Sequence, residues 1–303
     1  RYFLYDMVST GKRQIGSTIK PILYTLAMQE GLGPCDQVLN VQQTFVLPDG
    51  TTWTPRNSTD KREGEMVTLK WGLANSVNNI SGWVLKQFTP EAVVQMAHRM
   101  GITSFIDPVR AIFLGSSEVS VKEMVGAFSI YANKGVYNAP MMVTKIEDKY
   151  GNVLANFYPE SREVITENTA FLMANLLQGV VDEGTGRRLR FRYGFKNQIG
   201  GKTGTTQNHS DGWFIGITPD LAGGVWVGAE DRSIHFQNLA NGQGASMALP
   251  IWALFMQKVY ADKSLAVPQS DFQKPNGVNH VLDCGDADRD GMTDYDSSDE
   301  IFD

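Results

Sequence analysis

Long apolar runs are missing from this 303-residue sequence, and cysteine is nearly so. No stretch of about eighteen apolar residues occurs, so nothing in the printed sequence predicts a helix that spans a bilayer. The two cysteines, Cys35 and Cys284, lie too far apart for the short spacings of a metal site. A disulfide between them is possible, and two free thiols are at least as compatible with the sequence.

A basic surplus is also absent, because the formal net charge is −6. Residues 283–303 hold nine acids and one base, and the remainder of the chain is nearly neutral. Such a body lacks the electrostatic footprint of a nucleic-acid-binding protein. The sequence shows no signal peptide and opens on Arg1 instead of methionine, so we expect it to be an excised part of a longer protein.

Helix signals are spread along most of the chain. Thr89 followed by Pro90 is typical of a helix start, and Ser120 with Glu123 has the spacing of a capping box. Apolar periodicity and these end signals predict helices over residues 16–34, 89–101, 120–135, 166–184 and 246–262.

The residue pattern changes after the fourth of these helices. Residues 197–206, 211–220 and 221–231 are short apolar or glycine-rich runs separated by turns, which predicts successive antiparallel strands. We therefore expect a mixed α/β (α+β) domain whose antiparallel central sheet is flanked by helices. We place this domain at residues 1–265 and interpret residues 266–303 as a linker and an acidic tail.

The acidic tail contains half of a calcium-binding pattern. The weak candidate ligands are Asp286, Asp288, Asp290 and Asp294, with Gly291 for the turn. The twelfth position is Ser297, where an EF-hand loop has a bidentate glutamate. A solvated tail is the preferred interpretation, and low-affinity calcium binding is the alternative.

The stretch "GKTGTT" looks like the end of a phosphate-binding loop. A Walker-type loop has a glycine six residues before its lysine, and that position before Lys202 is Lys196. Without this glycine the backbone cannot wrap a phosphate in the usual way. Lys202 therefore requires another role.

Three further short patterns each have an ordinary structural explanation when taken singly. Serine precedes lysine by three residues at Ser9, Ser17 and Ser58, and only Ser17 opens an apolar helix. That spacing puts its hydroxyl and the amine of Lys20 on one helix face. A surface N-cap would look the same. Likewise Ser76-Val77-Asn78 could be a simple turn, and Lys202-Thr203-Gly204 a strand whose glycine leaves room for another backbone.

Taken together and in this order, the patterns resemble the signature set of penicillin-binding proteins and serine β-lactamases. The segments "RQIGSTIKP", "LGSSEVSVKEMVGAFSIYANKG", "GTGRR", "GGKTGTTQNHSDGWFIGITPD" and "ALPIWALFM" are similar to the transpeptidase domain of class A penicillin-binding proteins. The resemblance covers about residues 1–260. It implies a β-lactamase/transpeptidase-like fold that lacks its N-terminal strand, with a glycosyltransferase domain upstream.

The resemblance also implies a chemistry, that of a D,D-transpeptidase which cross-links peptidoglycan stem peptides and is acylated by β-lactams. Ser17 would be the nucleophile, Lys20 its base and Ser76 a proton relay. Burial and the charge of Lys202 would both lower the pKa of Lys20. The substrate-binding residues would be Asn78, Lys202, Thr203, Gly204 and Thr205, and the backbone N–H groups of Ser17 and Thr205 would form the oxyanion hole.

The implied partners are stem peptides and β-lactam antibiotics. No cofactor is required, and the parent protein would face the periplasm, attached to the cytoplasmic membrane through a segment outside this chain. His209, near the proposed site, is expected to be a rim residue and not a catalyst.

Three other functions would use the same motifs. A sensor would be acylated by a β-lactam without turning over, and a degenerate wall-binding domain would have lost catalytic positions that are intact here. A class A β-lactamase would need a Glu-x-x-x-Asn stretch. None of the glutamates between Ser76 and Lys202 has asparagine four residues later, which argues against a dedicated hydrolase.

Overall fold

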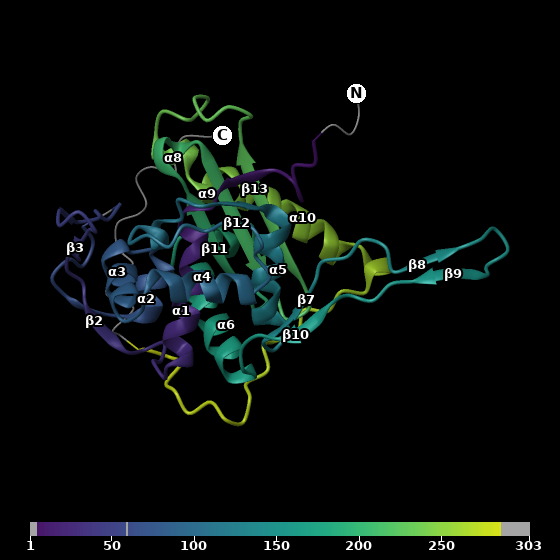
Figure 1. The fold of residues 1–303 in the computed structure, drawn as a ribbon. Coiled ribbons are helices and arrows are strands. Elements are labelled where there is room, and N and C mark those ends of the chain that lie inside the picture. The colour runs from purple at the N-terminus through teal and green to yellow at the C-terminus, as the bar shows by residue number, and fades with distance from the viewer. Residues whose placement is uncertain (1–4, 59, 286–303) are drawn as a thin grey trace.

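A three-stranded antiparallel sheet forms the centre of the molecule (Figure 1). The computed structural model describes residues 5–58 and 60–285. In that part, β11 (Gly200–Thr205), β12 (Asp211–Ile217) and β13 (Ala222–Gly228) are neighbours in sequence order. These are the three predicted strands, so the expected antiparallel central sheet is confirmed.

Helices cover both faces of this sheet, and β12 shows why. Its successive side chains point to opposite faces. Trp213 and Ile215 belong to the larger apolar core, whereas Phe214 between them belongs to a second, smaller core with Trp252. Because both faces of β12 are apolar, both must be covered, which requires three layers.

The larger core lies between the sheet and the helices α1 (Lys20–Gln29), α5 (Val121–Ala132) and α6 (Glu167–Asp182). The smaller core lies between the sheet and α10 (Leu249–Ala261), and the short helix α9 (Gly244–Met247) before it contacts β12. All five predicted helices are present, the fifth being α4 (Pro90–Arg99).

Side-chain caps fix several helix starts as the sequence predicts. The Thr89 hydroxyl accepts a hydrogen bond from the Ala92 N–H at 3.2 Å. Ser120 and Glu123 form a complete capping box. Burial raises the pKa of Glu123, but hydrogen bonds from Ser120, Ser104 and Thr103 outweigh it and lower that pKa to about 2. The carboxylate thereby ties residues 103–104, in the loop after α4, to the start of α5, which directly follows β6 (Glu118–Ser120).

The remaining elements are short and, apart from the 3₁₀ turn that opens the predicted helix over residues 16–34, were not predicted from the sequence. The helices among them are α2 (Leu69–Ala74), α3 (Asn78–Lys86), α7 (Arg188–Phe191) and α8 (Leu239–Gly242), with 3₁₀ turns η1 (Gly16–Ile19), η2 (Ile112–Leu114), η3 (Gln207–His209) and η4 (Lys263–Leu265). The strands are β1 (Lys12–Gln14), β2 (Gln37–Leu39), β3 (Phe45–Val46), β4 (Thr52–Trp53), β5 (Met66–Thr68), β7 (Val136–Asn138), β8 (Lys145–Glu147), β9 (Val153–Asn156) and β10 (Ser161–Glu163).

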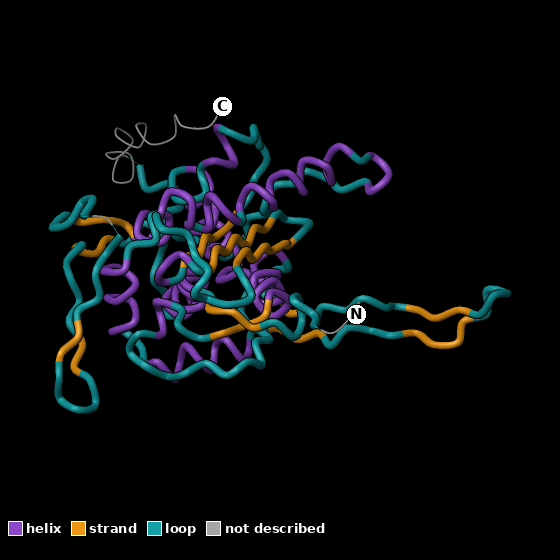
Figure 2. The backbone as a smooth tube through the Cα atoms, turned by 90° about the horizontal axis from the view of Figure 1, so that it is seen from above, coloured by secondary structure: helices purple, strands orange, loops and turns teal. Residues whose placement is uncertain are grey.

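These short strands pair two by two as β1–β6, β2–β5, β3–β4, β7–β10 and β8–β9. The β8–β9 hairpin projects far from the body in both views (Figures 1 and 2).

The segment interpreted as a linker is attached to the body over residues 266–285. It contains no helix or strand, yet Val278 is buried in the larger core. The Lys70 ammonium donates a hydrogen bond to the Leu282 carbonyl at 3.0 Å. Cys284 forms a disulfide with Cys35, with a Cα–Cα distance of 5.1 Å. The cysteine question is thus resolved in favour of the bridge, and the boundary at residue 265 stays a prediction.

Two further expectations concern calcium binding by the acidic tail and a membrane-spanning helix. The calcium candidates Asp286, Asp288, Asp290 and Asp294 lie outside the described residues. Within residues 5–58 and 60–285, no helix has the length and apolar character needed to cross a membrane.

The disulfide should contribute measurably to stability, because it joins positions 249 residues apart and so restricts the unfolded chain. Replacing both cysteines (Cys35→Ser with Cys284→Ser) should lower the free energy of unfolding by about 2–4 kcal/mol. Denaturant titrations of both proteins measure this. A reductant should destabilise the native chain and leave the double variant unchanged; equal stability of the two chains without reductant would contradict the prediction.

Candidate active site

Ser17 lies in the 3₁₀ turn η1, one turn ahead of α1, and not in the first turn of the α-helix itself. Gly16 has φ +52°, and a Cβ there would lie 2.7 Å from the Thr205 carbonyl oxygen. A Cβ on Gly204 would lie 2.7 Å from the Ile15 carbonyl oxygen. Only glycine permits this approach, so the open strand edge expected at Gly204 is used by the chain's own backbone. The contact brings the backbones of η1 and Thr205 together.

Ser76 occupies the corner between α2 and α3, with a left-handed φ of +56°. The Ser76 N–H donates to the Leu73 carbonyl at 3.1 Å, and the Val77 N–H to the Gly72 carbonyl at 2.9 Å. These two bonds close the C-terminal end of α2, and α3 begins at Asn78, two residues after Ser76. A left-handed serine is uncommon and is worth attention as a functional position.

The two lysines of the motifs meet at Ser76, as the sequence analysis expects. Lys20 Nζ donates to the Ser76 carbonyl oxygen at 2.6 Å and to Asn78 Oδ1 at 2.7 Å, and lies 3.3 Å from Ser76 Oγ. Lys202 Nζ donates to Ser76 Oγ at 3.0 Å and to the Thr203 carbonyl at 3.1 Å. The Ser76 hydroxyl therefore bridges the two amines.

Both amines are fully buried, which lowers their pKa values. Burial and the neighbouring charge of Lys202 hold the pKa of Lys20 well below its ordinary 10.5, the direction expected from the sequence. Burial lowers the pKa of Lys202 to about 7. Two contacts of Lys20 go to carbonyl-type oxygens, and the third partner is a hydroxyl, which can donate to the nitrogen when the amine is neutral.

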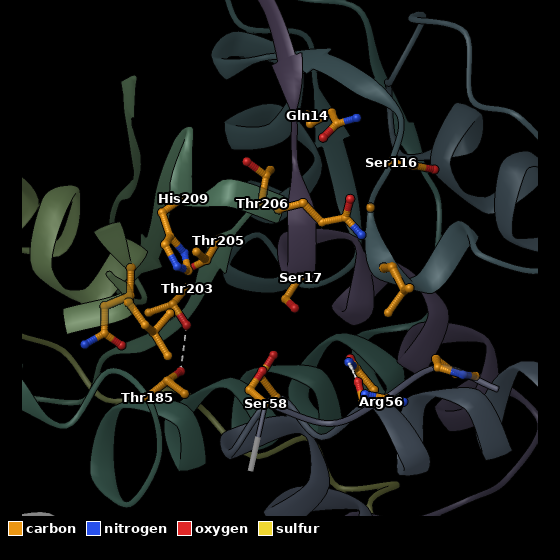
Figure 3. Close-up of a pocket in the computed structure, with 18 of the residues that line it drawn as sticks. Gln14, Ser17, Arg56, Ser58, Ser116, Thr185, Thr203, Thr205, Thr206 and His209 are labelled. Carbon is orange, nitrogen blue, oxygen red and sulfur yellow. Dashed lines mark hydrogen bonds between the residues drawn. The ribbon is translucent and has the colours of Figure 1, made fainter. Parts of the chain in front are cut away.

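These groups lie at a cavity of about 840 Å³ that Ser17 lines. Ser17 is partly exposed, and within the described residues its hydroxyl has no hydrogen-bond partner. Thr203, Thr205 and His209 line one side of the cavity and Arg56 with Ser58 the other, with Ser17 between them in the view of Figure 3. In the part of the chain that the structure describes, no aspartate or glutamate lines it. Ser17 is therefore accessible to a ligand, and the two lysines lie behind the wall.

The strand wall carries hydroxyls whose positions are fixed. Thr203 Oγ1 is 2.7 Å from Thr185 Oγ1, the contact drawn in Figure 3. Thr205 Oγ1 accepts a hydrogen bond from the Gly244 N–H at 3.0 Å. Sequence reasoning missed Thr185 as a site residue, although it is the threonine of the "GTGRR" segment used for the resemblance.

The opposite wall is a loop, residues 53–58, that the sequence analysis did not connect with the site. Asn78 Nδ2 donates to the Arg56 carbonyl at 2.7 Å, which leaves one of its two N–H groups for a ligand. Asn57 Oδ1 accepts from the N–H groups of Asn78 and Asn79, at 2.8 and 3.0 Å, and so caps α3. No signal within this loop indicated the arrangement.

The rim position expected for His209 agrees with the structure, since His209 is half-buried and lines the cavity. His209 lies in η3, the turn after β11, and the buried Asp211 stabilises this turn. Asp211 accepts hydrogen bonds from the Thr206 hydroxyl at 2.8 Å and the Trp226 indole N–H at 3.1 Å. Asp211 is a structural anchor that sequence reasoning missed.

Comparison with known proteins agrees with this geometry. The family model described as the penicillin binding protein transpeptidase domain matches residues 3–231. Penicillin-binding protein 1A of Aquifex aeolicus is 31% identical over 90% of this chain and 36% of its own length. Penicillin-binding protein 2D of Bacillus subtilis is also 31% identical, over 91% of this chain and 40% of its own length. The chain thus spans about two fifths or less of these relatives.

Solved structures show the same fold. Penicillin-binding protein 1A from Haemophilus influenzae superposes with a TM-score of 0.80 at 24% identity, over 90% of this chain and 45% of that one. The PonA1 protein from Mycobacterium tuberculosis, solved with penicillin V, has a TM-score of 0.74 at 22% identity, over 94% of this chain and 77% of its own. At these identities the likeness establishes the fold, and the family match comes from the sequence. The chain belongs to the penicillin-binding protein transpeptidase family.

Proposed function

We propose that this domain is a serine D,D-transpeptidase that joins peptidoglycan stem peptides through an acyl-enzyme and is acylated by β-lactams. One observation carries the proposal: two buried amines share the Ser76 hydroxyl behind the cavity into which Ser17 opens. A serine hydroxyl is a weak nucleophile without a base, and an amine with a lowered pKa supplies that base near neutral pH.

In the first half-reaction, Ser17 Oγ attacks the carbonyl carbon between the two terminal D-alanines, and Lys20 takes its proton. The N–H groups of Ser17 and Thr205 stabilise the developing oxyanion, a role supported by the close approach of their backbones. The protonated Lys202 attracts the terminal carboxylate, which accepts hydrogen bonds from the hydroxyls of Thr203 and Thr205. Gly204 keeps the strand close to η1, and the free N–H of Asn78 holds the peptide amide.

As the carbon–nitrogen bond breaks, the proton passes from Lys20 through Ser76 to the departing amine, and D-alanine leaves. In the second half-reaction, an amine of another stem peptide attacks the Ser17 ester. That amine loses one proton to Lys20, which returns it to Ser17. Every bond is exchanged between protein and peptides, so we propose that no cofactor takes part.

We further propose that the chain is the transpeptidase part of a longer, membrane-anchored protein that also carries a glycosyltransferase domain. The relatives are more than twice as long as the matched region, which supports this. The Cys35–Cys284 disulfide supports an extracytoplasmic location, because disulfides persist in oxidising compartments.

Fluorescent penicillin should label the native chain covalently, and Ser17→Ala should abolish labelling because the attacking oxygen is gone. Ser58→Ala is a matched control, since Ser58 lines the same cavity and also precedes a lysine by three residues. We expect it to label normally. Undiminished labelling of Ser17→Ala, with folding verified by circular dichroism, would remove Ser17 from the mechanism.

The native chain should also release D-alanine from a stem-peptide donor when an acceptor amine is supplied. The expected product is a new amide between the two peptides, measured by mass spectrometry. A sensor would label with penicillin and release no D-alanine. A β-lactamase would lose its penicillin label within seconds.

The rate constant of acylation should depend on pH in a bell shape. It should rise on the acid side as Lys20 loses its proton, and fall through about pH 7 as the free enzyme's Lys202 does the same and ceases to attract a carboxylate. In Lys202→Arg the alkaline decline should disappear, because a guanidinium stays charged. A native profile that is flat from about pH 6 to pH 9 would contradict these roles.

A further inference from the structure

Besides the two lysines behind its wall, the cavity has a cationic side chain in its lining, and the described part of the chain does not neutralise it. Arg56 is exposed and lines the cavity. Within residues 5–58 and 60–285 its guanidinium forms no salt bridge, and no carboxylate lines the cavity around it. An unpaired guanidinium beside a substrate cleft is suited to bind an anionic group of the ligand, because its fork matches a carboxylate in a bidentate way.

The backbone that carries Arg56 is held from both sides. On one side, the Trp53 ring packs against Phe45 and Phe113, with centroid distances of 5.8 and 6.2 Å. On the other, Asn57 caps α3 through the N–H of Asn78. The Arg56 carbonyl itself accepts a hydrogen bond from Asn78. Arg56 is therefore attached to the same asparagine that receives a hydrogen bond from Lys20.

This attachment defines which part of a ligand Arg56 can meet. Thr203 and Thr205, on the β11 wall, face the terminal carboxylate in the proposed mechanism, and Ser17 attacks the next carbonyl. The acyl part of the peptide then extends away from that carboxylate, past Asn78. Arg56 lies on this far wall, across Ser17 from Thr203 in Figure 3.

We propose that Arg56 forms an anion subsite for a second carboxylate, carried on the acyl part of the donor that stays attached to Ser17. The subsite would favour donors with a carboxylate there over donors in which it is amidated or absent. This inference rests on the proposed function, since it needs Ser17 to be acylated.

Two penicillins test the subsite directly. Carbenicillin differs from benzylpenicillin by one carboxylate on its acyl side chain, the part that corresponds to the acyl portion of a stem-peptide donor. The second-order acylation rates of both are measured by competition with fluorescent penicillin. In Arg56→Gln the ratio of the carbenicillin rate to the benzylpenicillin rate should fall roughly fivefold, the effect of a partly exposed ion pair. Arg56→Lys should recover part of the ratio, and added salt should lower it in the native chain.

The control is Arg192→Gln, an exposed arginine outside the cavity lining, which should leave the ratio unchanged. An unchanged ratio in Arg56→Gln would overturn the subsite while both drugs still label Ser17. An equal fall in both rates would also overturn it, because Arg56 would then only support the loop. Failure of both penicillins to label the native chain would instead overturn the proposed function, and the subsite with it.

Discussion

The burial of two lysine amines around one serine hydroxyl is the constraint on which the site depends. Within the described residues, neither Lys20 nor Lys202 has a carboxylate partner; their contacts are hydroxyl and carbonyl oxygens. Burying an unpaired charge costs several kcal/mol, so each pKa falls instead. The fold supplies the stability that this arrangement costs through two apolar cores on opposite faces of one sheet. A general base at neutral pH follows from that burial.

Three segments distant in sequence must keep this geometry, and direct contacts between them do so. The η1 turn is held against β11 by the glycines at positions 16 and 204. The Thr185 N–H donates to the Ala74 carbonyl at 3.0 Å, at the end of α2 and next to the Ser76 corner. The hydroxyl of the same threonine contacts Thr203 on β11. Thr185 thus connects the corner that positions Ser76 to the strand that carries Lys202. Through this residue the helical layer is joined to the sheet at the site itself.

Local rules predicted what depends on local physics. The caps at Thr89 and Ser120, the three strands of the central sheet and the five longer helices follow from propensity, period and turn signals, and the structure has them. The short hairpins and the loop at Arg56 depend on tertiary contacts, such as Asn57 with the start of α3, which no local pattern encodes. The sequence could not distinguish the disulfide from free thiols either. The pairing depends on residues 266–285, which bring Cys284 next to Cys35, just after α1, only in the folded chain. The lysine and serine motifs were placed together by resemblance, and their separations come from the structure.

The chemical inventory of the cavity bears on the fate of the proposed acyl-enzyme. From residues 5–58 and 60–285, its lining receives hydroxyls, amides, one guanidinium and one imidazole, but no carboxylate. Water attacks an ester effectively only when a base next to it removes a proton, which a carboxylate commonly provides. An amine is already nucleophilic and becomes acidic only after it has attacked, so the single amine of Lys20 suffices for its proton. Among the described residues, the lack of acids at the cavity supports the proposed transfer to an amine over hydrolysis, and it is also what leaves Arg56 without an ion-pair partner.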